Sequence, residues 1–310
     1  MHAENQSRIL EGKVIIVTGA GQGVGRAVAM RAAAEGASVI VNDLGTGPAG
    51  SGSDGSRAES VVKEIREAGG TAVASTDSIA DRKSADRIIA AAVDTFGRID
   101  CVVNNAGILR DRMFYNMADE EWHDVVQVHL NGYYYVSRAA APHFKEQNSG
   151  SYIHCTSVSG LIGNAGQANY AAAKMGIVGL STGIAHDMAR FNVRSNCIGP
   201  SAWSALLETV PIRSEEQRER MEAMRLNMRA DQVAPLCTFL ASDLSREVNG
   251  QIFTVRGNEI ALFTQTRPFR TAHNGNGWTT ESIAEVMLPA FRRDFFPVIK
   301  HTELFSWNPF

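Results

Sequence analysis

Short runs of β-branched and aliphatic residues alternate along the chain with longer, alanine-rich segments of helical period. The runs that predict strands are Lys13–Val17, Ser38–Asn42, Thr71–Ser75, Cys101–Val103, Tyr152–Cys155, Val193–Ile198 and Gln251–Val255. The segments that predict helices are Val24–Glu35, Arg57–Ala68, Asp81–Phe96, Asp119–Lys145, Gln167–Phe191 and Asp231–Ser242. Aliphatic runs without polar alternation are typical of strands buried on both faces of a parallel sheet. The alternation therefore predicts one α/β domain, residues 1–260, built on a doubly wound parallel sheet.

The pattern changes after the last predicted strand. Residues 261–310 hold nine aromatic residues. Because so much aromatic surface is unfavourable in water, we expect this aromatic-rich C-terminal extension to pack on its own domain or on a partner subunit. It would then lie in an oligomer interface or form a wall of the substrate site.

Composition and charge narrow the classes of function. Hydrophobic residues make up 44% of the 310 residues and charged residues 20%, which is ordinary for a globular chain. A formal net charge of −3 favours neither nucleic acid nor anionic lipid as a partner. The aliphatic run Val14–Val17 is far too short to span a bilayer, and residues 1–11 are too polar for a signal peptide. We therefore expect a cytoplasmic protein that binds neither nucleic acid nor membrane.

The four cysteines indicate no special chemistry. Cys101, Cys155, Cys197 and Cys237 are widely spaced and form neither C-x-x-C pairs nor zinc-ligand spacings with histidine. Three of them lie in or beside apolar runs, where a free cysteine is usually a small buried hydrophobe. We expect no metal site and no disulfide.

A glycine-rich turn, TGAGQGVG at 18–25, joins the first predicted strand to the first predicted helix. Glycines let the backbone approach a pyrophosphate, and the free N–H groups at the start of the helix attract its charge. The position of the turn between a strand and a helix predicts dinucleotide binding. The residues expected to hold the phosphates are Gly19, Gly21, Gln22, Gly23, Val24 and Gly25.

Asp43 follows the second predicted strand. A carboxylate there can accept hydrogen bonds from a ribose diol and would repel a 2′-phosphate; the alternative is an aspartate that only caps the following loop. No lysine or arginine follows Asp43 before Arg57, so we predict NAD rather than NADP. The glycine- and serine-rich stretch Gly45–Ser56 is either a flexible connector or a flap over the cofactor ribose.

Tyr170 and Lys174 are four residues apart in a predicted helix and therefore lie one turn apart on one face. Tyrosine, with an ordinary pKa of about 10, is a poor base at neutral pH. A neighbouring ammonium and an oxidised nicotinamide would stabilise the tyrosinate. The pair lies 13 residues after Ser157, at the end of a predicted strand, which favours acid/base chemistry at this place.

Further motifs accompany the pair: NNAG at 104–107, Asn131, SVSG at 157–160, YAAAK at 170–174 and CIGP at 197–200. Together with the glycine turn, they resemble the short-chain dehydrogenase/reductase family over nearly all of residues 9–260. The resemblance implies a Rossmann-type sheet of about seven strands. It also implies NAD(P)-dependent oxidation of an alcohol or reduction of a ketone.

The same resemblance implies roles for single residues. Tyr170 is the general acid/base, and Lys174 binds the nicotinamide ribose and lowers the pKa of the tyrosine. Ser157 binds the substrate oxygen and Asn131 holds a water that relays the proton; alternatively, Asn131 caps a helix kink and Ser157 merely ends a strand. The other residues expected to bind the cofactor are Asp77, Ser78, Asn104, Ala106, Gly107, Pro200 and Ala202.

One stretch departs from the family. A Pro-Gly pair and a nearby threonine that contacts the nicotinamide usually follow the sixth strand. Here Pro200 is followed by Ser201, Ala202 and Trp203, so that contact has no assigned residue.

Within the family, NDLG at 42–45, DSIADR at 77–82 and NNAGILRDRMF at 104–114 are similar to one subgroup. It comprises the (3R)-hydroxyacyl-CoA dehydrogenase domain of peroxisomal multifunctional β-oxidation enzymes and bacterial stand-alone relatives. We therefore expect a 3-hydroxyacyl-CoA substrate; the alternatives are a hydroxysteroid or other bulky secondary alcohol without CoA, and a non-catalytic NAD-binding scaffold. The chain ends in Asn308-Pro309-Phe310, without a peroxisomal signal, so we expect a stand-alone cytoplasmic enzyme.

Two points stay open at this level. Arg110 and Arg112 either bind the CoA phosphates, which suit the guanidinium fork, or pair with Asp111 and Asp119 on a solvated loop. The family assembles into dimers and tetramers. A bulky extension after the last strand would block the tetramer-forming face, so we expect a homodimer, with a tetramer as the alternative.

Overall fold

Eight strands form a single sheet in the order β3–β2–β1–β4–β5–β6–β7–β8. The computed structural model describes residues 8–47, 50, 52, 54–203, 214–305 and 307. The strands are β1 (Val14–Thr18), β2 (Ser38–Asn42), β3 (Thr71–Ser75), β4 (Cys101–Asn104), β5 (Gly150–Cys155), β6 (Val193–Ser201), β7 (Ile252–Arg256) and β8 (Glu259–Leu262). β1 to β7 pair in parallel, and the strand order reverses between β1 and β4. The predicted doubly wound sheet is confirmed.

The eighth strand is the one that the sequence pattern did not predict. β8 runs antiparallel to β7 and pairs Glu259 with Arg256, so the turn consists of Gly257 and Asn258 alone. Gly257 has a φ of +60°, and Gly-Asn favours such a two-residue hairpin. β8 is short and alternately exposed, so it lacks the aliphatic run of the other strands. The sheet therefore continues to Leu262, inside the segment predicted as the extension.

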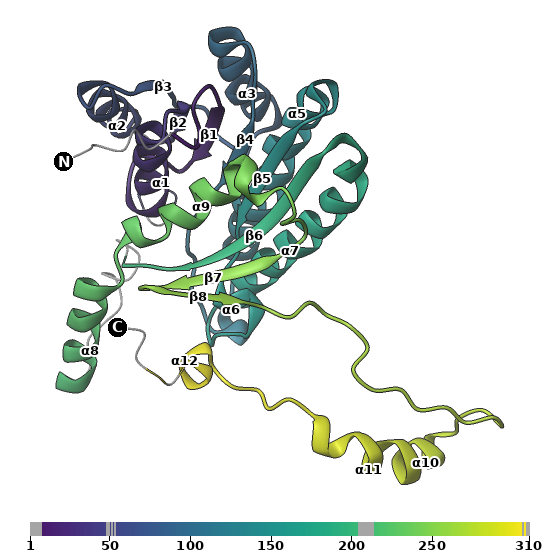
Figure 1. Cartoon of the computed structure of the whole chain (residues 1–310). Coiled ribbons are helices and arrows are strands. Elements are labelled where there is room, and N and C mark those ends of the chain that lie inside the picture. Colours follow the sequence, from purple (N-terminus) through teal and green to yellow (C-terminus); the bar gives the residue numbers. More distant parts are fainter. Residues whose placement is uncertain are drawn as a thin grey trace, which may run out of the picture.

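Helices cover both faces of the sheet (Figure 1). One face is covered by α1 (Gly23–Ala34), α2 (Ser56–Glu67) and α9 (Ala234–Ala241), and the other by α3 (Arg82–Phe96), α5 (Gly132–Gln147) and α7 (Ala168–Met188). Further helices are α4 (Asp119–Val126), α6 (Val158–Leu161) and α8 (Glu215–Asn227).

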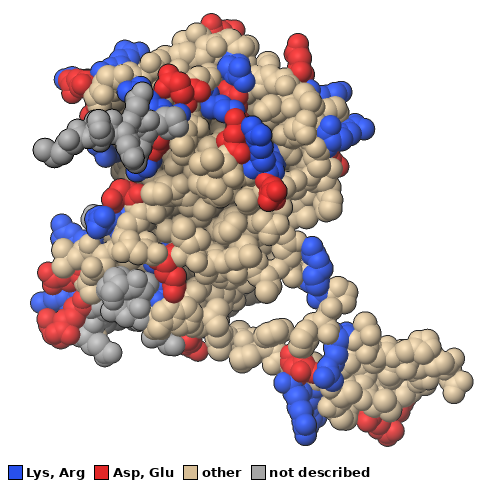
Figure 2. All heavy atoms as spheres, in the orientation of Figure 1, with Lys and Arg blue, Asp and Glu red and all other residues tan. Residues whose placement is uncertain are grey.

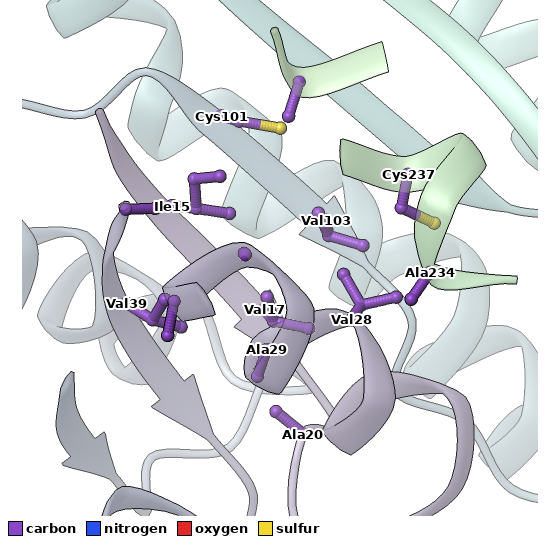
Figure 3. Packing of buried hydrophobic residues seen from close by; sticks show 14 of the residues in the cluster. Ile15, Val17, Ala20, Val28, Ala29, Val39, Cys101, Val103, Ala234 and Cys237 are labelled. Carbon is purple, nitrogen blue, oxygen red and sulfur yellow. The ribbon is translucent and has the colours of Figure 1, made fainter. Parts of the chain in front are cut away.

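Successive residues of β1 face two separate cores. Ile15 and Val17 pack with Val28 of α1 and Val103 of β4 on one face of the sheet (Figure 3), whereas Ile16 belongs to the cluster on the other face. All residues of β1 are buried, which explains its unbroken aliphatic run. The four cysteines are free and buried, and their predicted burial is confirmed.

The helix predicted over Asp119–Lys145 is continuous but not α-helical throughout. α4 passes into a π-helical segment, η2 (Gln127–Asn131), which continues into α5. A π-turn holds one residue more than an α-turn and is frequent at functional sites. Apolar periodicity alone did not reveal it.

The extension leaves the body of the molecule and returns to it (Figure 1). Near its two ends the Gln265 side chain donates to the Gly250 carbonyl, and the Arg256 guanidinium donates to the Phe305 carbonyl (3.3 Å). Between them lie the short helices α10 (Thr280–Ser282), α11 (Leu288–Phe291) and α12 (His301–Leu304), and no residue of 264–305 is buried. The ends of the extension therefore pack on their own domain, whereas its middle does not.

Charges of both signs are interspersed over the face shown in Figure 2. Of the helices in the described part of the chain, none is both long and apolar enough to cross a membrane.

Candidate active site

A cavity of about 530 Å³ opens at the carboxyl ends of the strands, where ligands of open α/β sheets bind. The predicted site residues that line it are Gly19, Gln22, Gly23, Val24, Asp43, Asp77, Ser78, Ala106, Gly107, Tyr170, Lys174, Pro200 and Ala202. The structure thus brings both the nucleotide-binding and the acid/base candidates to one cavity. The predicted residues absent from its lining are Gly21, Gly25, Asn104, Asn131 and Ser157.

The glycine turn is shaped by close contacts between backbone atoms. Gly19 has a φ of +63°, and a Cβ atom on it would lie 2.6 Å from the Cα of Ala106. A Cβ atom on Gly25 would lie 2.1 Å from the carbonyl oxygen of Gly19. At Gly23, by contrast, no atom lies within 4 Å of the corresponding place. Gly25 therefore packs the turn together, while Gly23 leaves the cavity wall open where α1 begins.

Asp43 caps the following loop and also lies in the cavity wall, where a ribose diol could reach it. Its Oδ2 accepts the N–H of Gly21 (2.7 Å) and its Oδ1 accepts the N–H of Gly45 (2.7 Å), so it caps the loop. It also lines the cavity, as do Thr46 and Gly47 from the stretch Gly45–Ser56. Positions 48, 49, 51 and 53 of that stretch lie outside the described residues.

Asp77 and Ser78 line the cavity beside the end of β3. Oδ1 of Asp77 forms an ion pair with Arg87 (2.6 Å), and Oγ of Ser78 accepts the N–H of Ala80 (3.2 Å). Both side chains are thus fixed by their own neighbours.

The NNAG motif places a different asparagine in the cavity from the one predicted. Asn104, expected to bind the cofactor, is fully buried, and its Nδ2 donates to Oγ of Ser137 (3.0 Å). Asn105 lines the cavity instead, and its Nδ2 donates to the carbonyls of Thr18 and Gly19 (3.0 Å each). Successive side chains at a strand end point to opposite sides, which explains the exchange.

Tyr170 and Lys174 stand on α7 and face the cavity. The Lys174 ammonium donates to the carbonyl of Cys155 (2.6 Å) and to the hydroxyl of Tyr133 (3.4 Å). Burial lowers the pKa of Lys174 to about 8 and raises the pKa of Tyr170 to about 12, the latter partly offset by a hydrogen bond with Ser157. The Lys174 ammonium lies 5.5 Å from the centre of the Tyr170 ring, and burial is the main cause of the raised tyrosine pKa.

Ser157 and Asn131 lie just outside the cavity wall. Ser157 caps α6, with its Oγ accepting the N–H of Ser159 (3.1 Å). Asn131 ends η2, and its Nδ2 donates to Oε1 of Gln127 (2.7 Å), which lines the cavity. Asn131 lies where the π-turn returns to α-helix, but its side chain does not cap α5.

His129 is a cavity residue that sequence reasoning missed. Its Nε2 lies 2.8 Å from the Ile108 carbonyl, and its ring meets that of Tyr170 edge to face at 5.1 Å between centroids. Burial holds the pKa of His129 well below its usual range, so the ring is neutral. Gly107 makes room for it, because a Cβ atom there would lie 2.2 Å from the ring. In the sequence, only the position of His129 two residues before Asn131 could have indicated that it belongs to the site.

The structure distinguishes the two arginines that the sequence left open. Arg110 lines the cavity and pairs with Asp124 (3.3 Å). Arg112 is not part of the lining and pairs with Glu121 (3.0 Å). Both arginines pair with carboxylates, as the second alternative predicted. The carboxylates, however, are those of Asp124 and Glu121 and not those of Asp111 and Asp119.

A family model described as short chain dehydrogenase matches residues 13–210. The hydroxyacyl-CoA dehydrogenase of Mycobacterium tuberculosis is 38% identical over 301 residues, which cover 93% of this chain and 89% of that relative. The peroxisomal multifunctional enzyme type 2 of Mus musculus is 46% identical over 245 residues, or 79% of this chain, but the match spans only 32% of that protein. A solved 7α-hydroxysteroid dehydrogenase, complexed with NADH and 7-oxo glycochenodeoxycholic acid, has a TM-score of 0.72 at 28% identity, covering 81% of this chain and 95% of that one.

Proposed function

We propose, from the premise that the chain belongs to the short-chain dehydrogenase/reductase family and is an oxidoreductase acting on CH–OH groups, that it transfers a hydride between NAD and a 3-hydroxyacyl-CoA. One observation carries the proposal: Tyr170 and Lys174 line the same cavity as the glycine turn and Asp43. An acid/base pair and a nucleotide-binding wall in one space suit a reaction in which a bound nucleotide and an alcohol meet.

The residues of the nucleotide wall fit a dinucleotide. The wall is open at Gly23, where α1 begins, and the residue before it, Gln22, provides no side-chain cap for the first N–H groups. Such a helix start attracts a pyrophosphate. Asp43 presents a carboxylate at the end of β2, which supports NAD over NADP because a 2′-phosphate would be repelled.

In this mechanism the nicotinamide, when bound, supplies the hydride acceptor for alcohol oxidation. Tyr170 takes the proton of the substrate hydroxyl at its phenolate oxygen, and Ser157 holds the substrate oxygen in place. Since burial raises the pKa of Tyr170 to about 12, the phenolate needs a nearby positive charge at neutral pH, and Lys174 provides one within the site. Asn131, whose amide donates to Gln127, would hold the water that relays the proton to solvent.

The names of two relatives support the substrate class. One is a hydroxyacyl-CoA dehydrogenase that matches almost the full length of this chain, and the other is a peroxisomal multifunctional enzyme. Arg110 at the cavity wall is the side chain best placed to meet a CoA phosphate, although it would have to exchange Asp124 for it.

The test is NADH formation by the purified protein with 3-hydroxyacyl-CoA thioesters, free hydroxysteroids and simple secondary alcohols. Turnover confined to the thioesters would support the proposal. The second candidate is a hydroxysteroid or other bulky alcohol without CoA, which the similarity to the 7α-hydroxysteroid dehydrogenase favours. Turnover of the free alcohols alone would establish that candidate and refute the first, and no turnover at all would favour a non-catalytic NAD-binding scaffold.

The proposal includes a homodimer in which the middle of the extension covers a partner subunit. Phe296 is 85% exposed and Val298 fully exposed within a segment that buries none of its residues. Such apolar exposure is typical of an interaction surface. Sedimentation of the purified chain would test this: a monomer refutes the dimer, and a tetramer would replace it. The cytoplasmic location stays a prediction, which cell fractionation would test.

A further inference from the structure

Asn169, the residue before Tyr170, is fully buried, and every hydrogen-bonding group of its side chain is used. Its Nδ2 donates to the carbonyls of Arg110 (3.0 Å) and Glu121 (2.9 Å), and its Oδ1 accepts the backbone N–H of Tyr170 (2.7 Å). One amide thereby joins the segment that follows the NNAG motif, helix α4 and the first turn of α7. A fully satisfied buried group of this kind makes its surroundings rigid.

The same segment makes two further contacts with the residues that lead into α7. Nε2 of Gln167 donates to Oδ2 of Asp111 (2.9 Å), and the N–H of Arg112 donates to the carbonyl of Gly166 (2.8 Å). Together with the bonds of Asn169, these contacts are named the α7 latch below. The latch fixes three successive residues, 110 to 112, against the start of the helix that carries Tyr170.

Ion pairs with α4 hold the two arginines of the segment 110–112, but Asp111 takes part in neither pair. Arg110 pairs with Asp124 and Arg112 pairs with Glu121, both on α4. The arginines on either side of Asp111 are therefore engaged with other carboxylates. The Asp111 carboxylate is bound by the neutral amide of Gln167, so its negative charge is not cancelled there.

Several elements place polar or titratable groups around the Tyr170 phenol. These groups are Lys174 from α7, His129 from η2, Tyr133 from α5, Cys155 from β5, Ser157 from the turn before α6, and Asp111 from the latch. Burial is the main cause that raises the pKa of Tyr170; the hydrogen bond with Ser157 lowers it, and electrostatic interactions with Cys155 and, less strongly, with Asp111 raise it further.

We propose that Asn169 and Asp111 are positioning residues for the acid/base step: through the α7 latch they fix the orientation of Tyr170. The proposal rests on the assigned role of Tyr170, but it goes further, because neither residue belongs to the cavity lining. Asn169 carries the geometric part of the proposal through its bonds to three segments, and Asp111 contributes through its bond to Gln167, so separate variants test the two residues.

The geometric part is tested with Asn169→Ala. We expect kcat to fall by roughly 100-fold, the scale of a misplacement of about 1 Å, with the Kd of NAD unchanged. Asn169→Ser keeps a hydroxyl that can accept the N–H of Tyr170 and donate to one carbonyl, so it should recover part of kcat. Unfolding curves verify that both variants are folded. An unchanged kcat in the folded Asn169→Ala protein overturns the geometric part.

The contribution of Asp111 is tested with Asp111→Ala, which removes the acceptor for Gln167, and with Asp111→Asn, which keeps an acceptor. We expect kcat to fall in Asp111→Ala and to be largely recovered in Asp111→Asn. The matched control is Asp119→Ala, because Asp119 is exposed, as Asp111 is, but lies outside the latch. An unchanged kcat in Asp111→Ala, or an equal loss in the control, refutes the role of Asp111.

A double-mutant cycle covers the case in which Asn169→Ala does not fold. Asp111→Ala and Gln167→Ala each break the same latch contact, so their effects on ln kcat should not add. Additive losses would overturn the latch. Failure of the underlying assignment looks different: Tyr170→Phe would then retain turnover, whatever the latch variants do.

Discussion

The two ends of the cavity are built in different ways. The nucleotide end consists of backbone, where Gly19 and Gly25 allow contacts that no side chain could share. The catalytic end consists of side chains, in which Lys174 and Asn169 are buried and bonded to carbonyl groups of other elements. The nucleotide end should therefore not tolerate a Cβ atom at Gly19 or Gly25. The catalytic end should not tolerate the loss of the polar atoms of Lys174 or Asn169.

The largest effect is expected from Tyr170→Phe, which removes one oxygen at the catalytic end. Turnover should fall by at least about 100-fold, because the acid/base group is lost. NADH binding, followed by its fluorescence, should stay nearly unchanged because the nucleotide end is intact. Retained turnover would contradict the assignment of Tyr170.

An added atom at the nucleotide end should come next. In Gly25→Ala the new Cβ would meet the Gly19 carbonyl oxygen at 2.1 Å, so the turn must shift. We expect weaker NAD binding and a free energy of unfolding lower by about 1–3 kcal/mol, measured by titration and by denaturant unfolding. The control is Gly275→Ala, where no atom lies within 4 Å of the added Cβ. Equal behaviour of the two variants would contradict the comparison.

Asp43→Asn separates charge from shape at the nucleotide end. The amide oxygen can still accept one loop N–H, but the repulsion of a 2′-phosphate is removed. The ratio of kcat/KM for NADP to that for NAD should rise by roughly tenfold, or about 1.4 kcal/mol. A ratio that does not change would leave Asp43 with the role of a loop cap alone.

The last expected effect concerns the pH dependence of stability. Burial lowers the pKa of His154 from 6.5 to about 3. Between these values the unfolded chain binds a proton that the folded chain does not, so stability falls as the pH falls, by at most about 1.4 kcal/mol per pH unit. Unfolding midpoints should show a shallower loss in His154→Gln and the unchanged loss in His273→Gln, which alters an exposed residue. Equal slopes would contradict this.

The sequence predicted those features that repeat or that depend on a local motif. The strands of the parallel sheet follow from aliphatic runs, and the glycine turn and the Tyr170–Lys174 pair follow from spacing. The exchange of Asn104 for Asn105 did not follow, because it depends on where the strand ends to within one residue. The bonds of Asn169 were equally hidden, since its partners lie 59 and 48 positions away and are backbone carbonyls. Carbonyl groups are the same at every residue and leave no signal in the sequence.

The π-turn of η2 sets the rotational phase between the two halves of one long helix. α4 contacts Asn169 beside Tyr170, whereas α5 covers the sheet. Each residue of an α-helix turns the chain by about 100°, so the additional residue in η2 determines which side of α4 faces α7 while α5 stays in place. A deletion of one residue here would keep an unbroken helix, yet Glu121 would turn away from Asn169 and Val125 would leave its cluster with Ile108 and Ala173. Which side of α4 faces α7 therefore depends on the number of residues in η2 rather than on their chemistry.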